Sequence, residues 1–67
     1  MKPWDELTRD EITYLVEQKI HHQRNRRIIL RRLLDGVCFE PLAEEFDLSV
    51  RQVKNIVYKC EDILFRK

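Results

Sequence analysis

The chain has 67 residues and a formal net charge of +1, with 37% of its residues charged. This length allows one compact domain that buries a comparatively small share of its surface. One glycine and two prolines leave little material for hairpins or flexible linkers, so we expect an all-helical fold. Two cysteines are too few for a disulfide framework, and no apolar run is long enough to span a bilayer. The composition therefore predicts a reduced, cytoplasmic protein and excludes membrane insertion.

Charged residues are unevenly distributed along the chain. Residues 1–20 carry three basic and five acidic side chains, whereas residues 21–67 carry ten basic and seven acidic ones. The segment 49–59 holds Arg51, Lys54 and Lys59 and no carboxylate. A local concentration of Lys and Arg attracts phosphate more effectively than net charge does, so this segment is the first candidate for contact with nucleic acid.

A capping pattern predicts a first helix over about residues 9–22. Thr8 stands three residues before Glu11, which is the spacing of a capping box. The apolar residues that follow recur at helical spacing and are Ile12, Leu15, Val16 and Ile20. We expect Trp4 and Leu7 to fold against this helix.

A second helix is predicted over about residues 25–35. Its apolar positions are Ile28, Ile29, Leu33 and Leu34, and the pair Asp35-Gly36 is typical of a helix end. The preceding segment His21-His22-Gln23 contains no glycine or proline. Two arrangements therefore remain open, a break between the two helices and one continuous helix with a kink.

The last third of the chain has the pattern of a helix-turn-helix. We expect a short helix from Phe39, a turn at 47–49, and a final helix that Ser49 caps and that extends to about residue 66. The small side chain of Ala43 allows the two helices to cross closely. The final helix has an apolar stripe of Val53, Ile56, Val57, Cys60 and Leu64. The predicted fold is all-α, a small three- to four-helix bundle that forms one domain over residues 1–67 and contains a helix-turn-helix over about 39–66.

The polar face of the predicted final helix has residue types that read the DNA major groove. Arg bonds guanine bidentately, Asn does the same to adenine, and Lys reaches a base acceptor or a phosphate. Arg51, Lys54, Asn55 and Tyr58 are spaced by three, four and seven residues, so we expect them to point one way. The hydroxyl of Ser49 and the helix N-terminal amides suit a phosphate. The predicted DNA-binding residues are Ser49, Val50, Arg51, Gln52, Lys54, Asn55, Tyr58 and Lys59.

Any amphipathic helix has a polar outer face, so that face alone is weak support for DNA binding. The absence of acidic residues over 49–59 strengthens the interpretation. The preceding helix-turn pattern strengthens it further, because it explains Ala43 and Ser49 as well as the basic face.

The segment from Phe39 to Ile56, FEPLAEEFDLSVRQVKNI, resembles the helix-turn-helix in the fourth conserved region of bacterial sigma factors. The likeness covers about residues 26–67. It implies binding of an upstream promoter element in the major groove and contact with the flap of RNA polymerase. By position it implies base reading by Val50, Arg51, Lys54 and Asn55.

Two positions depart from the sigma-like pattern. Cys38 stands where the family often has a Thr or Ser helix cap, and Asp47 stands where many such turns have Gly. A chain of this length has no room for the sigma regions that melt promoter DNA. The resemblance therefore implies a free-standing regulator or accessory protein of the phage or mobile-element type, not a complete sigma factor.

A cluster of five arginines precedes the helix-turn-helix. Three roles remain open for it: contact with the DNA backbone, contact with the acidic N-terminal segment, and an ordinary solvated face. Adjacent residues on a helix point in different directions, so Arg31 and Arg32 are expected to have different roles. The full cluster is Arg24, Arg26, Arg27, Arg31 and Arg32.

The sequence favours neither a metal site nor catalysis. His21 and His22 face differently on a helix, and neither cysteine has a second one at ligand spacing. Cys60 lies on the apolar stripe and is interpreted as a small core residue. We find no phosphate loop, nucleophile elbow or paired carboxylates, so we predict a protein that is not an enzyme and uses no cofactor.

Together these features predict sequence-specific binding of double-stranded DNA in transcription regulation. A homodimer joined through the N-terminal helix is left open, because tight specific binding by this fold commonly uses two copies. The alternative function is a sigma-like protein-interaction module that docks on RNA polymerase or a phage partner.

Overall fold

The computed structural model describes residues 7–65 and contains four helices. They are α1 (Arg9–Lys19), α2 (Gln23–Leu34), α3 (Phe39–Glu45) and α4 (Val50–Phe65). No strand occurs within residues 7–65, so the predicted all-α class is confirmed. Trp4, which was expected to fold against the first helix, lies outside the described residues.

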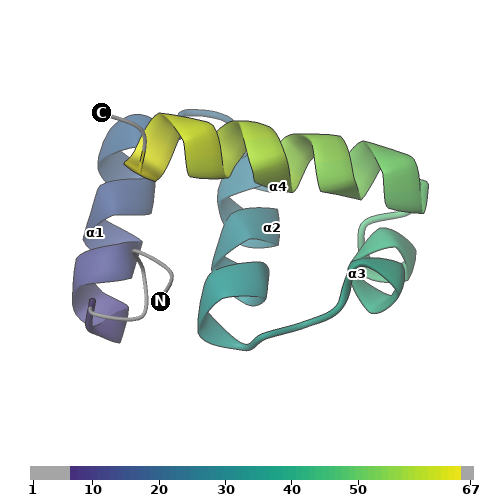
Figure 1. Cartoon of the computed structure of the whole chain (residues 1–67), viewed down its shortest axis with the longest axis horizontal. Helices are drawn as coiled ribbons and strands as arrows, with labels where there is room; N and C mark the ends of the chain where they lie inside the picture. Colours follow the sequence, from purple (N-terminus) through teal and green to yellow (C-terminus); the bar gives the residue numbers. More distant parts are fainter. Residues whose placement is uncertain (1–6, 66–67) are drawn as a thin grey trace.

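The helices form two pairs, α1 with α2 and α3 with α4, and the pairs share one core. In Figure 1, α1 and α2 stand side by side and run in opposite directions, and α4 lies across their ends. The short α3 sits beneath the N-terminal half of α4, at the end of the molecule away from α1. This arrangement leaves the upper side of α4 facing away from the other three helices.

The core consists of apolar side chains from every helix. Each fully buried side chain of this kind stabilises the fold by roughly 1.5–3 kcal/mol relative to its exposed state. The buried residues are Ile12, Val16, Ile20, Ile28, Ile29, Leu42, Ala43, Val53, Val57, Cys60 and Leu64. The apolar positions that the sequence predicts at helical spacing face this core: Leu15, Leu33, Leu34 and Ile56 are partly buried, and the others are buried. Leu7 and Leu15 pack partly against this core.

A capping box starts α1, as the sequence predicts. The Glu11 N–H donates to the Thr8 hydroxyl over 3.2 Å, and the Thr8 N–H donates to the Glu11 carboxylate over 3.0 Å. These two bonds satisfy donors that the first turn of a helix otherwise leaves unpaired. The helix ends at Lys19, three residues before the predicted end.

The arrangement of the first two helices, which the sequence leaves open, is a true break. Residues 20–22 are not helical, and Ile20 has extended backbone angles. The guanidinium of Arg26 donates to the carbonyls of Ile20 and Glu17, the latter over 2.8 Å. Carbonyls at a helix end have no partner within the helix, so this side chain satisfies them and ties α2 to the end of α1.

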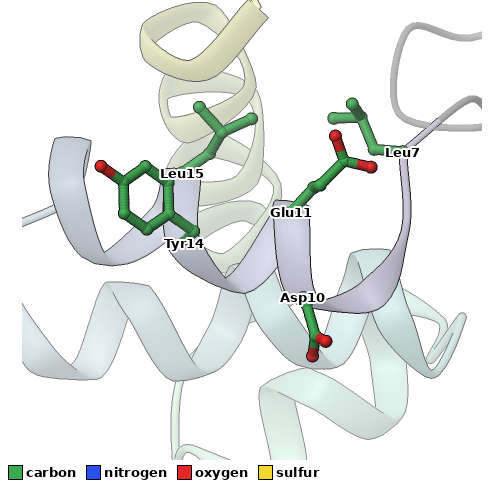
Figure 2. A pocket seen from close by; sticks show the side chains of 5 residues that line it. All are labelled: Leu7, Asp10, Glu11, Tyr14 and Leu15. Carbon is green, nitrogen blue, oxygen red and sulfur yellow. The ribbon is translucent and has the colours of Figure 1, made fainter.

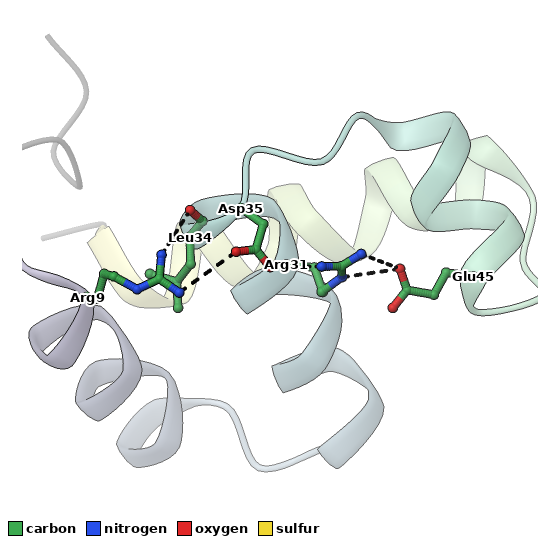
Figure 3. Close-up of polar contacts among 5 residues, drawn as sticks. All are labelled: Arg9, Arg31, Leu34, Asp35 and Glu45. Carbon is green, nitrogen blue, oxygen red and sulfur yellow. Dashed lines mark hydrogen bonds and ion pairs between the residues drawn. The ribbon is translucent and has the colours of Figure 1, made fainter.

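The second helix ends at Leu34, and Gly36 follows with a φ of 65°. This left-handed conformation favours glycine and explains why the helix stops at the predicted pair. An exposed ion network then joins three helices (Figure 3). The guanidinium of Arg31 lies 2.9 Å from Asp35 and 3.0 Å from Glu45, while Arg9 lies 3.8 Å from Asp35. The hydrogen bonds that Arg31 donates to Glu45 and Asp35 raise the pKa of Arg31.

Within residues 7–65, no helix is both long enough and apolar enough to cross a membrane.

The Arg26 contacts predict a measurable contribution to stability. Replacing Arg26 by Met keeps helix propensity but leaves the carbonyls of Ile20 and Glu17 without this donor. We expect the free energy of unfolding to fall by about 2 kcal/mol, as for charge-assisted hydrogen bonds. The matched control is Arg24→Met, because Arg24 is exposed and its hydrogen bond to the neighbouring Asn25 is long, at 3.5 Å. Urea denaturation measures both, and equal losses would contradict the role assigned to Arg26.

Candidate nucleic-acid interface

The turn between α3 and α4 is a compact hydrogen-bonded unit. The N–H of Leu48 donates to the carbonyl of Ala43 over 2.8 Å, and the N–H of Asp47 donates to the carbonyl of Glu44 over 3.3 Å. This pair of bonds forms a Schellman motif, which satisfies carbonyls at the end of α3. Leu48 also packs partly against the core. The chain direction after α3 is therefore fixed by backbone bonds and by apolar packing together.

Asp47 takes the conformation that glycine has in many turns of this kind. Its φ is 56°, and it is the sole non-glycine residue with positive φ among residues 7–65. Asp and Asn tolerate the left-handed region better than most side chains. The departure from glycine at this position is thus compatible with the same turn geometry.

A second capping box begins α4. The Gln52 N–H donates to the Ser49 hydroxyl over 3.1 Å, and the Ser49 N–H donates to the Gln52 side-chain oxygen over 2.9 Å. Ser49 and Gln52, both predicted DNA-binding residues, therefore use their side-chain oxygens to cap the helix. The hydroxyl hydrogen of Ser49 and the side-chain NH₂ of Gln52 are separate donors, so each retains a group that suits a phosphate.

The buried stripe of α4 determines which residues lie outermost. Val53, Val57, Cys60 and Leu64 face the core. Helical periodicity puts Arg51 and Asn55 on the opposite side, and both are exposed. We call these two residues the crest of α4. Gln52 and Lys59, seven residues apart, are exposed along one flank of the crest.

The other flank of the crest leans toward α3. The Lys54 amine lies 5.7 Å from the ring centre of Phe39, and the Tyr58 ring meets the Phe39 ring edge-on at 6.0 Å. Tyr58 remains 55% exposed. The four residues expected to point one way thus form two adjoining rows, with Arg51 and Asn55 outermost and Lys54 and Tyr58 beside Phe39. Val50, at the first position of α4, is half-buried.

Phe39 brings one member of the five-arginine cluster, Arg32, to the interface. The guanidinium of Arg32 lies 4.5 Å from the Phe39 ring centre and donates to the carbonyl of Val37 over 3.1 Å. Cations are attracted to an aromatic face at such distances. Arg32 and Lys54 are therefore held beside the same ring, although 22 positions separate them in the sequence. The aromatic side chain of Phe39, at the predicted start of the short helix, is the sequence feature that could have indicated this arrangement.

The other members of the arginine cluster have different surroundings. Arg26 binds the end of α1. Arg31 binds Asp35 and Glu45. The Arg27 guanidinium lies 5.6 Å from the Phe46 ring centre. Arg31 and Arg32 do have different partners, as expected from their adjacent positions. Arg32 is the member of the cluster that shares a partner ring with α4 residues.

Acidic residues limit the extent of the basic surface. On α4, Asp62 follows Asn55 by seven residues and therefore continues the line of the crest. On α3, Glu40 and Glu44 are exposed. Phosphate is repelled by carboxylates, so a surface suited to a nucleic acid is restricted to the first three turns of α4 and the Phe39 side.

Within residues 7–65, no group of three or more His, Cys, Asp or Glu residues is placed to hold a metal ion. Cys60 is buried in the core, as its place on the apolar stripe suggests, and burial raises the pKa of its thiol. Cys38 is exposed at the N-cap of α3 and makes no side-chain capping bond.

Comparisons with protein-family models, with curated proteins and with solved structures found no match. The likeness to sigma factors therefore rests on the residues of the helix-turn-helix themselves.

The conformation of Asp47 leads to a prediction for the turn. Replacing Asp47 by Ala puts a side chain without a local hydrogen-bonding group at positive φ, and we expect the free energy of unfolding to fall by about 1–2 kcal/mol. Asp47→Gly removes the steric penalty and should leave stability within about 0.5 kcal/mol of the parent. Glu44→Ala is the control for loss of a nearby exposed carboxylate. Thermal unfolding of the three variants tests the account, and equal stability of the Ala and Gly variants would count against it.

Proposed function

We propose that this protein binds double-stranded DNA in a sequence-specific manner and acts in transcription regulation. The observation that carries the proposal is the crest of α4, which a hydrogen-bonded turn and a capping box hold outward at the end of a short helix. A helix-turn-helix reads DNA by inserting its second helix, N-terminal residues first, into the major groove. The exposed groups at the start of α4 are of the types that pair with base edges.

In this proposal the residues divide into base readers and phosphate binders. Arg51 and Asn55 read bases from the crest, with Lys54 beside them. Ser49, Gln52, Tyr58 and Lys59 hold phosphates on the two sides, and Val50 contacts the groove at the start of the helix. Arg32 joins the phosphate binders, because it lies beside the Phe39 ring that Lys54 and Tyr58 also contact. Phosphate contacts position the helix and base contacts specify the site.

The sigma-like resemblance supports a role at promoters and contact with RNA polymerase as part of the same proposal. The rival function is a protein-interaction module that keeps this shape and docks on RNA polymerase or a phage partner. The two differ in chemistry. DNA binding neutralises phosphates and weakens steeply with salt, whereas an apolar docking surface is much less sensitive to salt.

Sequence selection from a random duplex pool tests base reading directly. We expect the parent protein to select a defined site at near-physiological salt. Replacing Arg51 by Ala should weaken binding to that site by about 1–3 kcal/mol and relax base choice at one position. Lys19→Ala, an exposed basic residue on α1, should leave the selected site unchanged. Selection of no site by the parent, or an unchanged preference in the Arg51 variant, would contradict this assignment.

The salt dependence of affinity tests the phosphate contact assigned to Arg32. Replacing Arg32 by Met should weaken binding about equally for all duplexes and reduce the slope of log K against log salt concentration by about 1. Arg24→Met removes an exposed charge from the same helix and should leave the slope nearly unchanged. Fluorescence anisotropy at several salt concentrations measures both. A slope that is the same for the two variants would remove Arg32 from the interface.

A further inference from the structure

A shallow apolar hollow lies on the outer side of α1, at the end of the molecule away from the helix-turn-helix. It has a volume of about 480 Å³ and is lined by Leu7, Asp10, Glu11, Tyr14 and Leu15. Figure 2 shows Leu7 on one side of the hollow and the Tyr14–Leu15 pair on the other, with Glu11 between them. We call Leu7, Tyr14 and Leu15 the apolar floor of the hollow, and we call the carboxylates of Asp10 and Glu11, with the adjoining Glu17, its acidic rim.

Tyr14 is not part of the buried core. The residue is 64% exposed, more than the two other exposed large hydrophobic residues of the described chain, Tyr58 and Ile63. The core contacts of α1 come instead from Ile12 and Val16 on the opposite side of the helix. Single exposed apolar residues are common, but this one adjoins the half-buried Leu7 and Leu15 in one concave surface. Tyrosine is also among the residues enriched at protein interfaces.

The outer face of α1 is acidic. Asp10 and Glu17 flank Tyr14 at helical spacing, and Glu11 lies between Leu7 and Tyr14. The nearest cation in the sequence, Arg9, turns toward α2, where it donates to the carbonyl of Leu34 and lies 3.8 Å from Asp35. Among the described residues, the charged side chains that line or adjoin the hollow are therefore carboxylates, which repel phosphate and attract basic groups.

We propose that this face of α1 is the docking surface for another protein, which inserts an apolar side chain flanked by Lys or Arg. The apolar floor supplies the anchor site, and Asp10, Glu11 and Glu17 supply complementary charge for the basic neighbours. An amphipathic helix or short peptide with these residues matches a shallow groove of this size. The inference goes beyond the proposed DNA binding and does not depend on it.

Two other occupants fit the charges less well. DNA is disfavoured by the carboxylates at the rim. A second copy of this chain would pair the face with itself, and an antiparallel pair about a two-fold axis would bring the Asp10 and Glu17 carboxylates of the two copies together. Like charges opposed in this way weaken an interface. The acidic rim therefore argues against the homodimer through the N-terminal helix that the sequence left open.

The position of the hollow leaves both surfaces accessible together. In Figure 1, α1 stands at one end of the molecule and the N-terminal part of α4 is at the other. A partner on α1 would therefore not cover the crest of α4. In this arrangement the protein acts as an adaptor. It holds a basic segment of the partner near the DNA site that the crest of α4 binds.

Peptide display on the full chain tests the docking surface. A random peptide library is selected against the immobilised protein, and the affinities of enriched peptides are measured for three variants. We expect the peptides to carry Leu, Phe or Trp next to at least two Lys or Arg residues. Their affinity should fall at least tenfold on Tyr14→Ala and severalfold on the double variant Asp10→Asn, Glu17→Gln. Tyr58→Ala is the matched control, because it removes an exposed tyrosine from α4. It should leave peptide affinity unchanged, although it removes a proposed phosphate contact.

Other outcomes would overturn the proposal. One is a selection that enriches no peptide, and another is enrichment of acidic peptides. A third is a set of peptides that bind the Tyr14→Ala variant as tightly as the parent. Circular dichroism checks that this variant is folded. A dimer that sedimentation detects and that Tyr14→Ala dissociates would assign the hollow to a second copy. Peptide binding that appears only after removal of residues 1–6 would assign it to the chain's own N-terminal segment. DNA affinity measured on the Tyr14 variant should equal that of the parent, so failure of this proposal is distinct from failure of DNA binding.

Discussion

The geometry of the helix-turn-helix depends on four consecutive residues, from Phe46 to Ser49. Asp47 adopts a left-handed conformation, and the two hydrogen bonds of the Schellman motif close the end of α3. Ser49 then starts α4 at once through its reciprocal bonds with Gln52. Because both helix ends are satisfied within so short a segment, the turn has few alternative conformations, and the direction of α4 follows from that of α3. Every role given to the crest depends on this constraint.

The parts of the fold that local rules govern could be predicted from the sequence. The capping box of Thr8 and Glu11, the glycine that ends α2 and the buried stripe of α4 all involve residues within a few positions of one another. Such features are encoded by spacing and by the conformational preferences of single residues. Cys60 belongs to the same class, since its place on the stripe identified it as a core residue.

Features that join distant segments could not be predicted in this way. The break between α1 and α2 contains no glycine or proline, and its stabilising contact comes from Arg26, whose partners lie six and nine positions earlier. Arg32 and Lys54 meet at the Phe39 ring only because three helices converge there. Spacing along α4 alone also predicted one row of Arg51, Lys54, Asn55 and Tyr58, because it does not include the contacts that α3 makes with Lys54 and Tyr58. The hollow at Tyr14 likewise involves Leu7, which precedes the helix, so α1 taken alone does not reveal it.

The two ends of the molecule are assigned opposite chemistry: a basic crest for DNA and an acidic, apolar face for a protein segment. The proposed DNA binding requires that the start of α4 enters the major groove. Amide chemical shifts of the full chain, followed during titration with a duplex, test this claim most directly. We expect the largest shift changes on residues 49–55 and on Arg32, and nearly unchanged shifts on α1. Changes that concentrate on α1, or that leave residues 49–55 unaffected when DNA is bound, would contradict the claim.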